Sequence, residues 1–359
     1  MLETHLSILQ TGAQSVNMEF VNSRKEHEVS VMLHCAPWRG LREQHVQVEL
    51  SARFNRHSIS HIDQQIETQW SQRIAEEPWI FNGAKFRLHS AIIIDQTPET
   101  LPNCVCDGGE LQSERISQEP GFTHLKVEPS KQKDGCQKDE IRLCLQLGLT
   151  CYKDYLGTNW SRDAKVLQRR GQDEFGDPQV LLAQPLGVGA VMTTADHQVV
   201  LLRRSQRVAE ATGLLDIPGG HPEPKTLCEG ASEACISIDL LRGKEKAVVA
   251  EIFMSVCAEI RDEVNVPLSS LGEPVLLGIA LNHTSAGRPS AEFCVRCSLT
   301  AKEVQEFYWR GGPEAHESTD IMFLTEKDLL CLDESAPLWS ELCPSAKGAV
   351  MLYRKVMDF

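Results

Sequence analysis

Three carboxylates occupy neighbouring positions near the end of a predicted amphipathic helix. Glu259 and Glu263 are four residues apart, and Asp262 follows Glu259 by three residues, so a helix brings them onto one side. Like charges at this spacing repel one another. A divalent cation such as Mg²⁺ would remove the repulsion, because this ion favours a few carboxylates together with water and phosphate oxygens. Taken alone, the pattern also fits a solvated acidic face on which Arg261 forms local ion pairs.

The helix that carries these carboxylates is expected over residues 245–264. Phe253, Val256 and Ile260 recur at intervals of three and four residues, which is the pattern of a buried helix face. Glu263 lies at the edge of this apolar stripe, so its carboxylate is expected to be partly removed from water. Partial burial increases the cost of like-charge contacts and therefore the benefit of a bound cation.

A turn rich in proline and glycine, residues 218–224, precedes the helix and belongs to the segment 214–224. Together with residues 258–266 it resembles the signature of the Nudix hydrolases, which reads G-x₅-E-x₇-R-E-U-x-E-E-x-G-U with U an apolar residue. The matching residues are Gly220, Glu259, Ile260, Asp262, Glu263 and Val266. The sequence departs from the signature at Thr226, Ala258 and Asn265, which replace its first glutamate, its arginine and its late glycine. The spacer is lengthened to the 31 residues 227–257.

The resemblance implies both a fold and a metal site. The implied fold class is α/β, with a C-terminal α/β/α sandwich on a mixed sheet that follows a smaller α/β N-terminal domain. The implied catalytic residues are Glu259 and Glu263, which would bind Mg²⁺ as the cofactor, with Asp262 as a second-rank ligand. Because the signature arginine is missing, Glu251 and Ser255 are considered as substitutes in the shell around the site.

Further stretches throughout the chain resemble a branch of the family that hydrolyses UDP-glucose and UDP-galactose to UMP and the sugar 1-phosphate. A UDP-sugar is therefore the implied small-molecule partner, and protein partners are left unknown. Phe81 and Tyr152 offer flat faces for stacking on uracil, although each also fits a role in the core. Gly219 and Gly220 are expected to adopt positive φ in a tight turn. The substrate contacts that the resemblance implies are Phe81, Tyr152, Arg204, Ala209, Asp216, His221, Pro222, Glu223 and Ser345.

Several roles stay open. The general base is not identified; Glu223, Glu314, His316 and Glu317 lie in loop-like segments, and each also fits a structural role. Arg204 belongs to a basic run that either grips the diphosphate or pairs with surface acids. Two alternatives to the leading function are kept: a catalytically weak Nudix-like module that binds a nucleotide or a protein, and the same chemistry on another substrate such as ADP-ribose or a dinucleoside polyphosphate.

The hydropathy pattern divides the chain into a loose N-terminus at 1–26, an N-terminal α/β domain at 27–180 and a Nudix hydrolase domain at 181–359. Composition indicates a mobile insertion at 96–140, with 4 Pro and 4 Gly, and a poorly ordered stretch at about 225–243. The expected strands are 29–35, 85–94, 141–151, 187–194, 199–204, 275–282 and 291–298. The expected helices are 59–75, 245–264 and 300–308, together with 152–170 after its first few residues.

Composition and charge exclude several classes of protein. With 36 Lys+Arg and 50 Asp+Glu the net charge is −14, and such a surface repels nucleic acids and anionic membranes, so neither is expected as a partner. The N-terminus lacks a targeting signal, and no stretch approaches the ~20 apolar residues of a membrane span, which favours a soluble intracellular protein of the cytoplasm and/or nucleus. Cys294 and Cys297 form the only C-x-x-C among 13 cysteines. A strand there places the two thiols on opposite faces, so zinc is not expected.

Overall fold

The computed structural model describes residues 27–94, 140–206 and 210–357. The loose N-terminus predicted at 1–26 lies outside these ranges. The same holds for the insertion predicted at 96–140, apart from Glu140, and for the predicted substrate contact Ala209.

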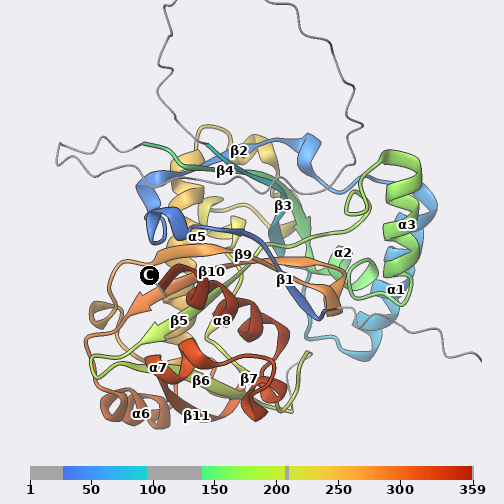
Figure 1. Cartoon of the computed structure of the whole chain (residues 1–359). Helices are drawn as coiled ribbons and strands as arrows, with labels where there is room; N and C mark the ends of the chain where they lie inside the picture. Colours follow the sequence, from blue (N-terminus) through green and yellow to red (C-terminus); the bar gives the residue numbers. More distant parts are fainter. Residues whose placement is uncertain (1–26, 95–139, 207–209, 358–359) are drawn as a thin grey trace, which may run out of the picture.

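A large mixed sheet forms the centre of the molecule (Figure 1). Its strand order is β1-β9-β10-β5-β6-β11, with β7 paired to β6 and β8 paired to β5. Strands β10 and β5 run parallel, and the other neighbours run antiparallel. The strands are β1 (Val29–His34), β5 (Gly187–Thr193), β6 (Gln198–Arg204), β7 (Leu215–Asp216), β8 (Gly219–Gly220), β9 (Val275–Asn282), β10 (Arg288–Arg296) and β11 (Ser318–Thr325).

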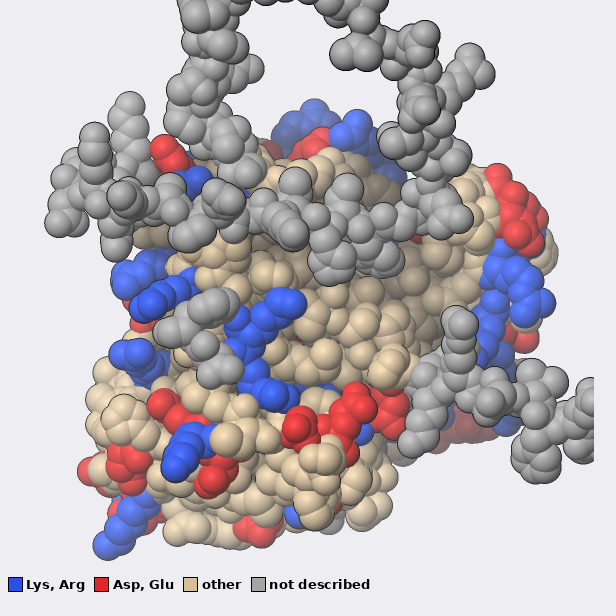
Figure 2. Space-filling model, viewed as in Figure 1, with Lys and Arg blue, Asp and Glu red and all other residues tan. Residues whose placement is uncertain are grey.

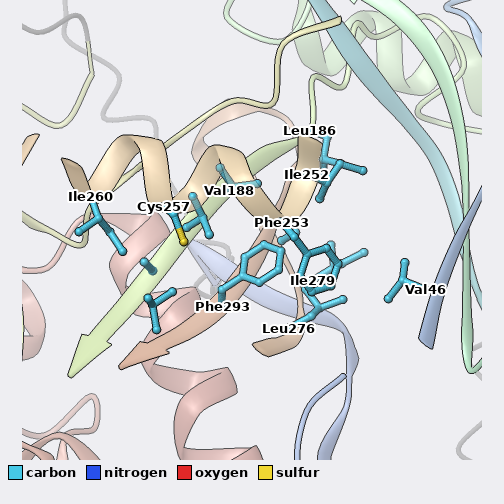
Figure 3. Close-up of a cluster of buried hydrophobic side chains, with 14 of the residues drawn as sticks. Val46, Leu186, Val188, Ile252, Phe253, Cys257, Ile260, Leu276, Ile279 and Phe293 are labelled. Carbon is cyan, nitrogen blue, oxygen red and sulfur yellow. The ribbon is translucent and has the colours of Figure 1, made fainter. Parts of the chain in front are cut away.

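Two helices cover opposite faces of this sheet, α5 (Glu245–Val264) and α8 (Pro344–Met357) (Figure 1). On the α5 side, Phe253 packs against Phe293 of β10 with ring centroids 5.0 Å apart, as Figure 3 shows. On the α8 side, Val350 and Leu352 belong to a separate buried cluster with Leu277 of β9. Burial on both sides of one sheet confirms the predicted α/β/α sandwich.

A smaller sheet has the order β2-β4-β3, from β2 (Val46–Leu50), β4 (Leu143–Cys151) and β3 (Ala84–Ile93). Helix α1 (Ser60–Glu76) packs beside α3 (Ala164–Phe175) through a buried cluster that includes Ile62, Ile66 and Leu167. In the segment 152–170, expected to be helical after its first few residues, the first residues already form α2 (Tyr152–Gly157), and α3 begins only at Ala164. Between them the buried Asn159 donates hydrogen bonds to Gln184 Oε1 and to the Ser285 carbonyl, so tertiary contacts interrupt the helix.

The two sheets are joined by the backbone. Leu186 donates its N–H to the Phe86 carbonyl at 2.9 Å, and Leu88 donates to the Gln184 carbonyl at 3.1 Å. The strand expected at 29–35 forms β1 and pairs with β9 of the large sheet. The first described segment therefore contributes to the sheet that carries the site, while the division at 180/181 stays a prediction.

The stretch at 225–243, predicted to be poorly ordered, instead forms short helical turns. They are η4 (Pro224–Leu227), η5 (Glu233–Cys235) and α4 (Ile238–Leu241). Cys228 and Leu241 are buried, and the Glu233 carboxylate accepts the Ala84 N–H at 2.8 Å. These long-range contacts, which composition does not reveal, order the enlarged spacer. The remaining helices are α6 (Ala301–Arg310), which begins after the Thr300 cap as predicted, and α7 (Glu326–Cys331).

Cys294 of β10 and Cys297, the residue after its end, lie on opposite faces as predicted: Cys297 belongs to the core cluster on the α5 side and Cys294 to the cluster on the α8 side. Acidic and basic side chains lie close to one another on the face drawn in Figure 2. Across the described ranges, none of the helices has the length and apolar content needed to cross a membrane.

Candidate active site

A pocket of about 950 Å³ opens where the two parts of the chain meet. Its walls come from the loop before α5, from α5 itself, from the first residues of β10 and α8, and from β3 and α2 of the smaller unit. This arrangement places the predicted carboxylate helix and most of the predicted substrate contacts around one cavity.

The loop over residues 219–223 is held against α5 by hydrogen bonds to glutamates. Gly219 donates its N–H to Glu263 Oε2 at 3.0 Å, and His221 donates to Glu259 Oε1 at 3.2 Å. Glu223 donates to Glu251 Oε1 at 2.9 Å. Alternate N–H groups of an extended loop thus reach successive carboxylates along the helix, which fixes the position of each carboxylate.

Glycine is required in this loop for a different reason from the one predicted. Gly219 and Gly220 are absent from the described residues with positive φ, and they form the short strand β8 beside β5. A Cβ at Gly219 would lie 2.5 Å from the Val188 carbonyl oxygen, and one at Gly220 would overlap the carboxylate of Glu259. The expectation of a tight turn with positive φ was therefore wrong. Glycine is needed here because close packing on both sides leaves no room for a side chain.

The carboxylates of the site are strongly desolvated. Burial, reinforced by Glu314, raises the pKa of Glu259 to about 7. Glu263 is 7% exposed, and burial together with Glu259 raises its pKa well above the ordinary value. Asp262 differs, since both of its oxygens accept hydrogen bonds from Arg261, at 2.7 and 2.6 Å. Glu259 and Glu263 are therefore the pair that a cation would stabilise.

The carboxylates of Glu259 and Glu263 suit an Mg²⁺ ion that has only two ligands from the protein. Among the residues that the structure describes, no group of three or more His, Cys, Asp or Glu side chains is placed to hold a metal ion. Mg²⁺ is commonly bound by one or two carboxylates and completes its octahedral shell with water and substrate phosphates. Two desolvated glutamates beside a large pocket match this mode of binding.

Two departures from the Nudix signature are explained by the structure. Asn265 ends α5 with φ 64°, a left-handed conformation that Asn tolerates in place of glycine. Glu251 holds the Glu223 N–H and so supports the loop, as considered for the missing arginine. Ser255 does not contribute in this way, because its hydroxyl donates to the Ile252 carbonyl of its own helix.

Comparison with known proteins identifies the family. No family model matches the chain. It is 45% identical over 328 residues to the mouse protein named uridine diphosphate glucose pyrophosphatase NUDT22, covering 91% of each chain. It is 46% identical to the cattle protein of the same name, covering 92% of this chain and 97% of that one. The chain belongs to the NUDT22 group of Nudix hydrolases. Nudix hydrolase 9 of Arabidopsis thaliana is 26% identical over 297 residues, which cover 83% of this chain and 81% of that one.

Most of the predicted substrate contacts of this Nudix hydrolase lie around the pocket. The predicted contacts that line the pocket are Tyr152, Arg204, Asp216, His221, Glu223 and Ser345. Phe81 does not line it and is 70% exposed, and Pro222 is buried outside the lining. Among the candidates for general base, Glu223, Glu314, His316 and Glu317 all line the pocket.

Arg204 and His221 differ in charge and in how they are held. Arg204 donates from Nη1 to Asp216 Oδ2 at 2.8 Å and from Nε to the Glu210 carbonyl at 3.0 Å. Burial, with Lys85 nearby, lowers the pKa of His221 well below its ordinary value, so its ring is neutral at pH 7. A fixed guanidinium and a neutral imidazole thus face the same cavity.

Several pocket residues of this Nudix hydrolase were not singled out from the sequence. Tyr155 and Trp160 line the pocket, and their rings stack with centroids 6.4 Å apart at an angle of 11°. Lys85 and Arg288 also line it. All four fall in stretches that resemble the family, which was the available signal, but only the folded chain shows that they face the cavity.

Proposed function

We propose that this Nudix hydrolase cleaves the diphosphate of UDP-glucose and UDP-galactose with Mg²⁺, giving UMP and the sugar 1-phosphate. Water adds across one P–O–P bond, so each product carries one phosphate. The observation that carries the proposal is the pair of desolvated glutamates, Glu259 and Glu263, fixed by loop N–H groups beside the pocket. The names of the mouse and cattle relatives support UDP-glucose as a substrate.

Glu259 and Glu263 are the residues that would hold the metal, with Asp262 kept as a second-rank ligand. Bound there, Mg²⁺ would neutralise the diphosphate and lower the pKa of the attacking water. The raised pKa of Glu259, about 7, supports this assignment, because the charged form that a cation needs is costly without one. The two loop N–H groups would keep the carboxylates in place.

The organic parts of the substrate would be bound by the rest of the pocket. Tyr152 lines it, with its ring perpendicular to that of Trp70, and would stack on uracil, a contribution of about 1–3 kcal/mol. Ser345 lies at the N-terminus of α8, where the helix dipole favours a phosphate. Asp216 and Glu223 would accept hydrogen bonds from sugar hydroxyls, and the neutral ring of His221 would offer one further contact.

The proposed substrate contacts also include Ala209, together with Phe81 and Pro222, two residues that do not line the pocket in this structure. Phe81 would have to approach the pocket from its exposed position, Pro222 would act by shaping the loop, and Ala209 lies outside the described residues. The net charge of −14 supports a small, metal-bound anion as the partner in place of a nucleic acid or an anionic membrane.

The test is hydrolysis of a panel of UDP-, ADP- and GDP-sugars, ADP-ribose and a dinucleoside polyphosphate, with Mg²⁺ and with EDTA, resolved by chromatography. We expect UMP and sugar 1-phosphate from UDP-glucose and UDP-galactose, with much slower turnover of the others. Absence of UMP above the EDTA control would refute the proposal. Faster turnover of an ADP or GDP derivative would keep the chemistry and change the substrate.

A further inference from the structure

Arg288 differs from the other basic side chains of the pocket in its pairing. The basic residues that line the pocket are Lys85, Arg204, Arg288 and Lys347. Lys85, Arg204 and Lys347 form ion pairs with Glu223, Asp216 and Glu28, at 2.9, 2.8 and 2.5 Å. Arg288 forms no ion pair with any carboxylate of the described ranges, and its Nε is buried without a hydrogen-bond partner there. Its positive charge is therefore unshared.

The sheet provides space for this guanidinium. Arg288, Ser290 and Glu292 alternate along β10 and so point to the same face. The parallel neighbour β5 places Gly187 opposite Ser290. A Cβ at Gly187 would lie 3.0 Å from Arg288 Nη1 and 3.3 Å from Ser290 Oγ. Glycine at this position on β5 thus leaves room for the arginine side chain beside the sheet.

The nearest acid on the same strand face does not neutralise Arg288. Glu292 is fully buried. Burial raises its pKa to about 7, so Glu292 carries a full negative charge only well above that pH. No bridge between Glu292 and Arg288 forms, and the arginine keeps its capacity to bind an anion.

Arg288 also lies near the predicted metal ligands. After burial and Lys85, its charge is the next cause that lowers the pKa of His221. The N–H of His221 in turn donates to Glu259. Arg288 and Glu259 are thus both close to His221, in the part of the pocket where a diphosphate bound to a metal at Glu259 would extend.

We propose that Arg288 binds a phosphate group of the substrate's diphosphate and is an additional substrate-binding residue of this enzyme. The proposal rests on the proposed function for the identity of the substrate. A guanidinium offers two parallel N–H donors that match two oxygens of one phosphate. Arg204 already shares its charge with Asp216, whereas Arg288 offers its whole charge to the ligand.

The test compares the binding of UDP and of uridine by calorimetry in EDTA, and again with Ca²⁺, for the full chain and its variants. Arg288→Gln is expected to weaken UDP binding by ten- to a hundred-fold and to leave uridine binding within twofold. Arg288→Lys, which keeps the positive charge but not the two parallel N–H donors, is expected to weaken UDP binding three- to ten-fold. UDP binding by Arg288→Gln within twofold of the parent protein would overturn the proposal.

Arg203→Gln is the matched control, because Arg203 lies on β6, pairs with Glu341 at 2.9 Å and does not line the pocket. It should bind UDP like the parent protein. If Arg288→Gln does not fold, Arg288→Lys decides, and unchanged UDP affinity in that variant would refute the proposal. An equal loss of uridine affinity and UDP affinity in Arg288→Gln would also refute the proposal. So would the absence of UDP binding by the parent protein both in EDTA and with Ca²⁺. UDP binding that depends on Arg288 without any UMP production would instead refute only the proposed function.

Discussion

The backbone N–H of Gly219 donates to Oε2 of Glu263 over 3.0 Å, across 44 positions of sequence. This bond joins the glycine loop to the last turn of α5 and fixes a buried carboxylate, one helical turn beyond Glu259, which lines the pocket. Because Gly219 is also paired with Gly189 of β5, the loop, the helix and the central sheet meet at this one residue. The geometry of the candidate metal site therefore depends on the packing of three separate segments.

Replacement of Glu263 by Gln is expected to reduce turnover of UDP-glucose by at least about a hundred-fold while the fold is kept. The amide oxygen still accepts the Gly219 N–H, but the charge that a cation needs is gone. Initial rates and circular dichroism measure the two effects.

Glu245→Gln is the matched control for this variant. Glu245 lies at the other end of α5, and its carboxylate likewise accepts a backbone N–H, from Gly243 at 3.1 Å, far from the pocket lining. Its turnover should equal that of the parent. Equal losses in both variants, or unchanged turnover in Glu263→Gln, would count against Glu263 as a metal ligand.

Gly220→Ala is expected to abolish most of the activity, because the added methyl group would overlap the Glu259 carboxylate and displace it. Gly272→Ala serves as the control, since its new Cβ would meet its nearest neighbour, the Arg296 carbonyl oxygen, at an ordinary 3.4 Å. The comparison uses kcat/KM and melting temperature. A Gly220→Ala enzyme with parental kcat/KM would show that the position of Glu259 is not critical.

Mg²⁺ is expected to raise the melting temperature of the parent protein and not that of Glu263→Gln. A ligand present at a hundred times its Kd stabilises the folded state by about 2.7 kcal/mol. Differential scanning calorimetry with Mg²⁺ or EDTA measures this without any substrate. The same rise in both proteins would place the cation elsewhere.

Glu292→Gln is expected to change how stability depends on pH. Burial raises the pKa of Glu292 to about 7; the hydrogen bond from the Ser290 side chain lowers it, Asp216 raises it further, and Arg288 lowers it. An acid with a raised pKa stabilises the fold when protonated. This contribution is complete below the ordinary pKa of 4.5 and is lost as pH rises through about 7.

The parent protein should therefore lose up to about 3 kcal/mol of stability relative to Glu292→Gln between pH 5 and pH 8. Urea unfolding in EDTA at pH 5 and at pH 8 measures the free energy of unfolding of each protein. Thermal melting at the same pH checks that each protein starts folded. A difference that stays constant with pH would show that Glu292 ionises freely in the fold.

The sequence alone determined the elements whose pattern is local. The structure has α5 at the predicted residues 245–264 and β9 at the predicted residues 275–282. The periodicity of a helix or strand shows which of its sides is buried, so the element can be predicted without knowing its neighbours in the fold. The same spacing identified Glu259 and Glu263 as the candidate ligands.

Only the tertiary structure decided the features that depend on contact between distant segments. The spacer at 225–243 is ordered by contacts such as that of Glu233 with the Ala84 N–H. Gly219 and Gly220 are required by close packing against Val188 and Glu259, and not by their own φ. Arg288 is an ordinary arginine in the sequence. Whether its charge is shared depends on which carboxylates the fold brings near it, and that information is not local.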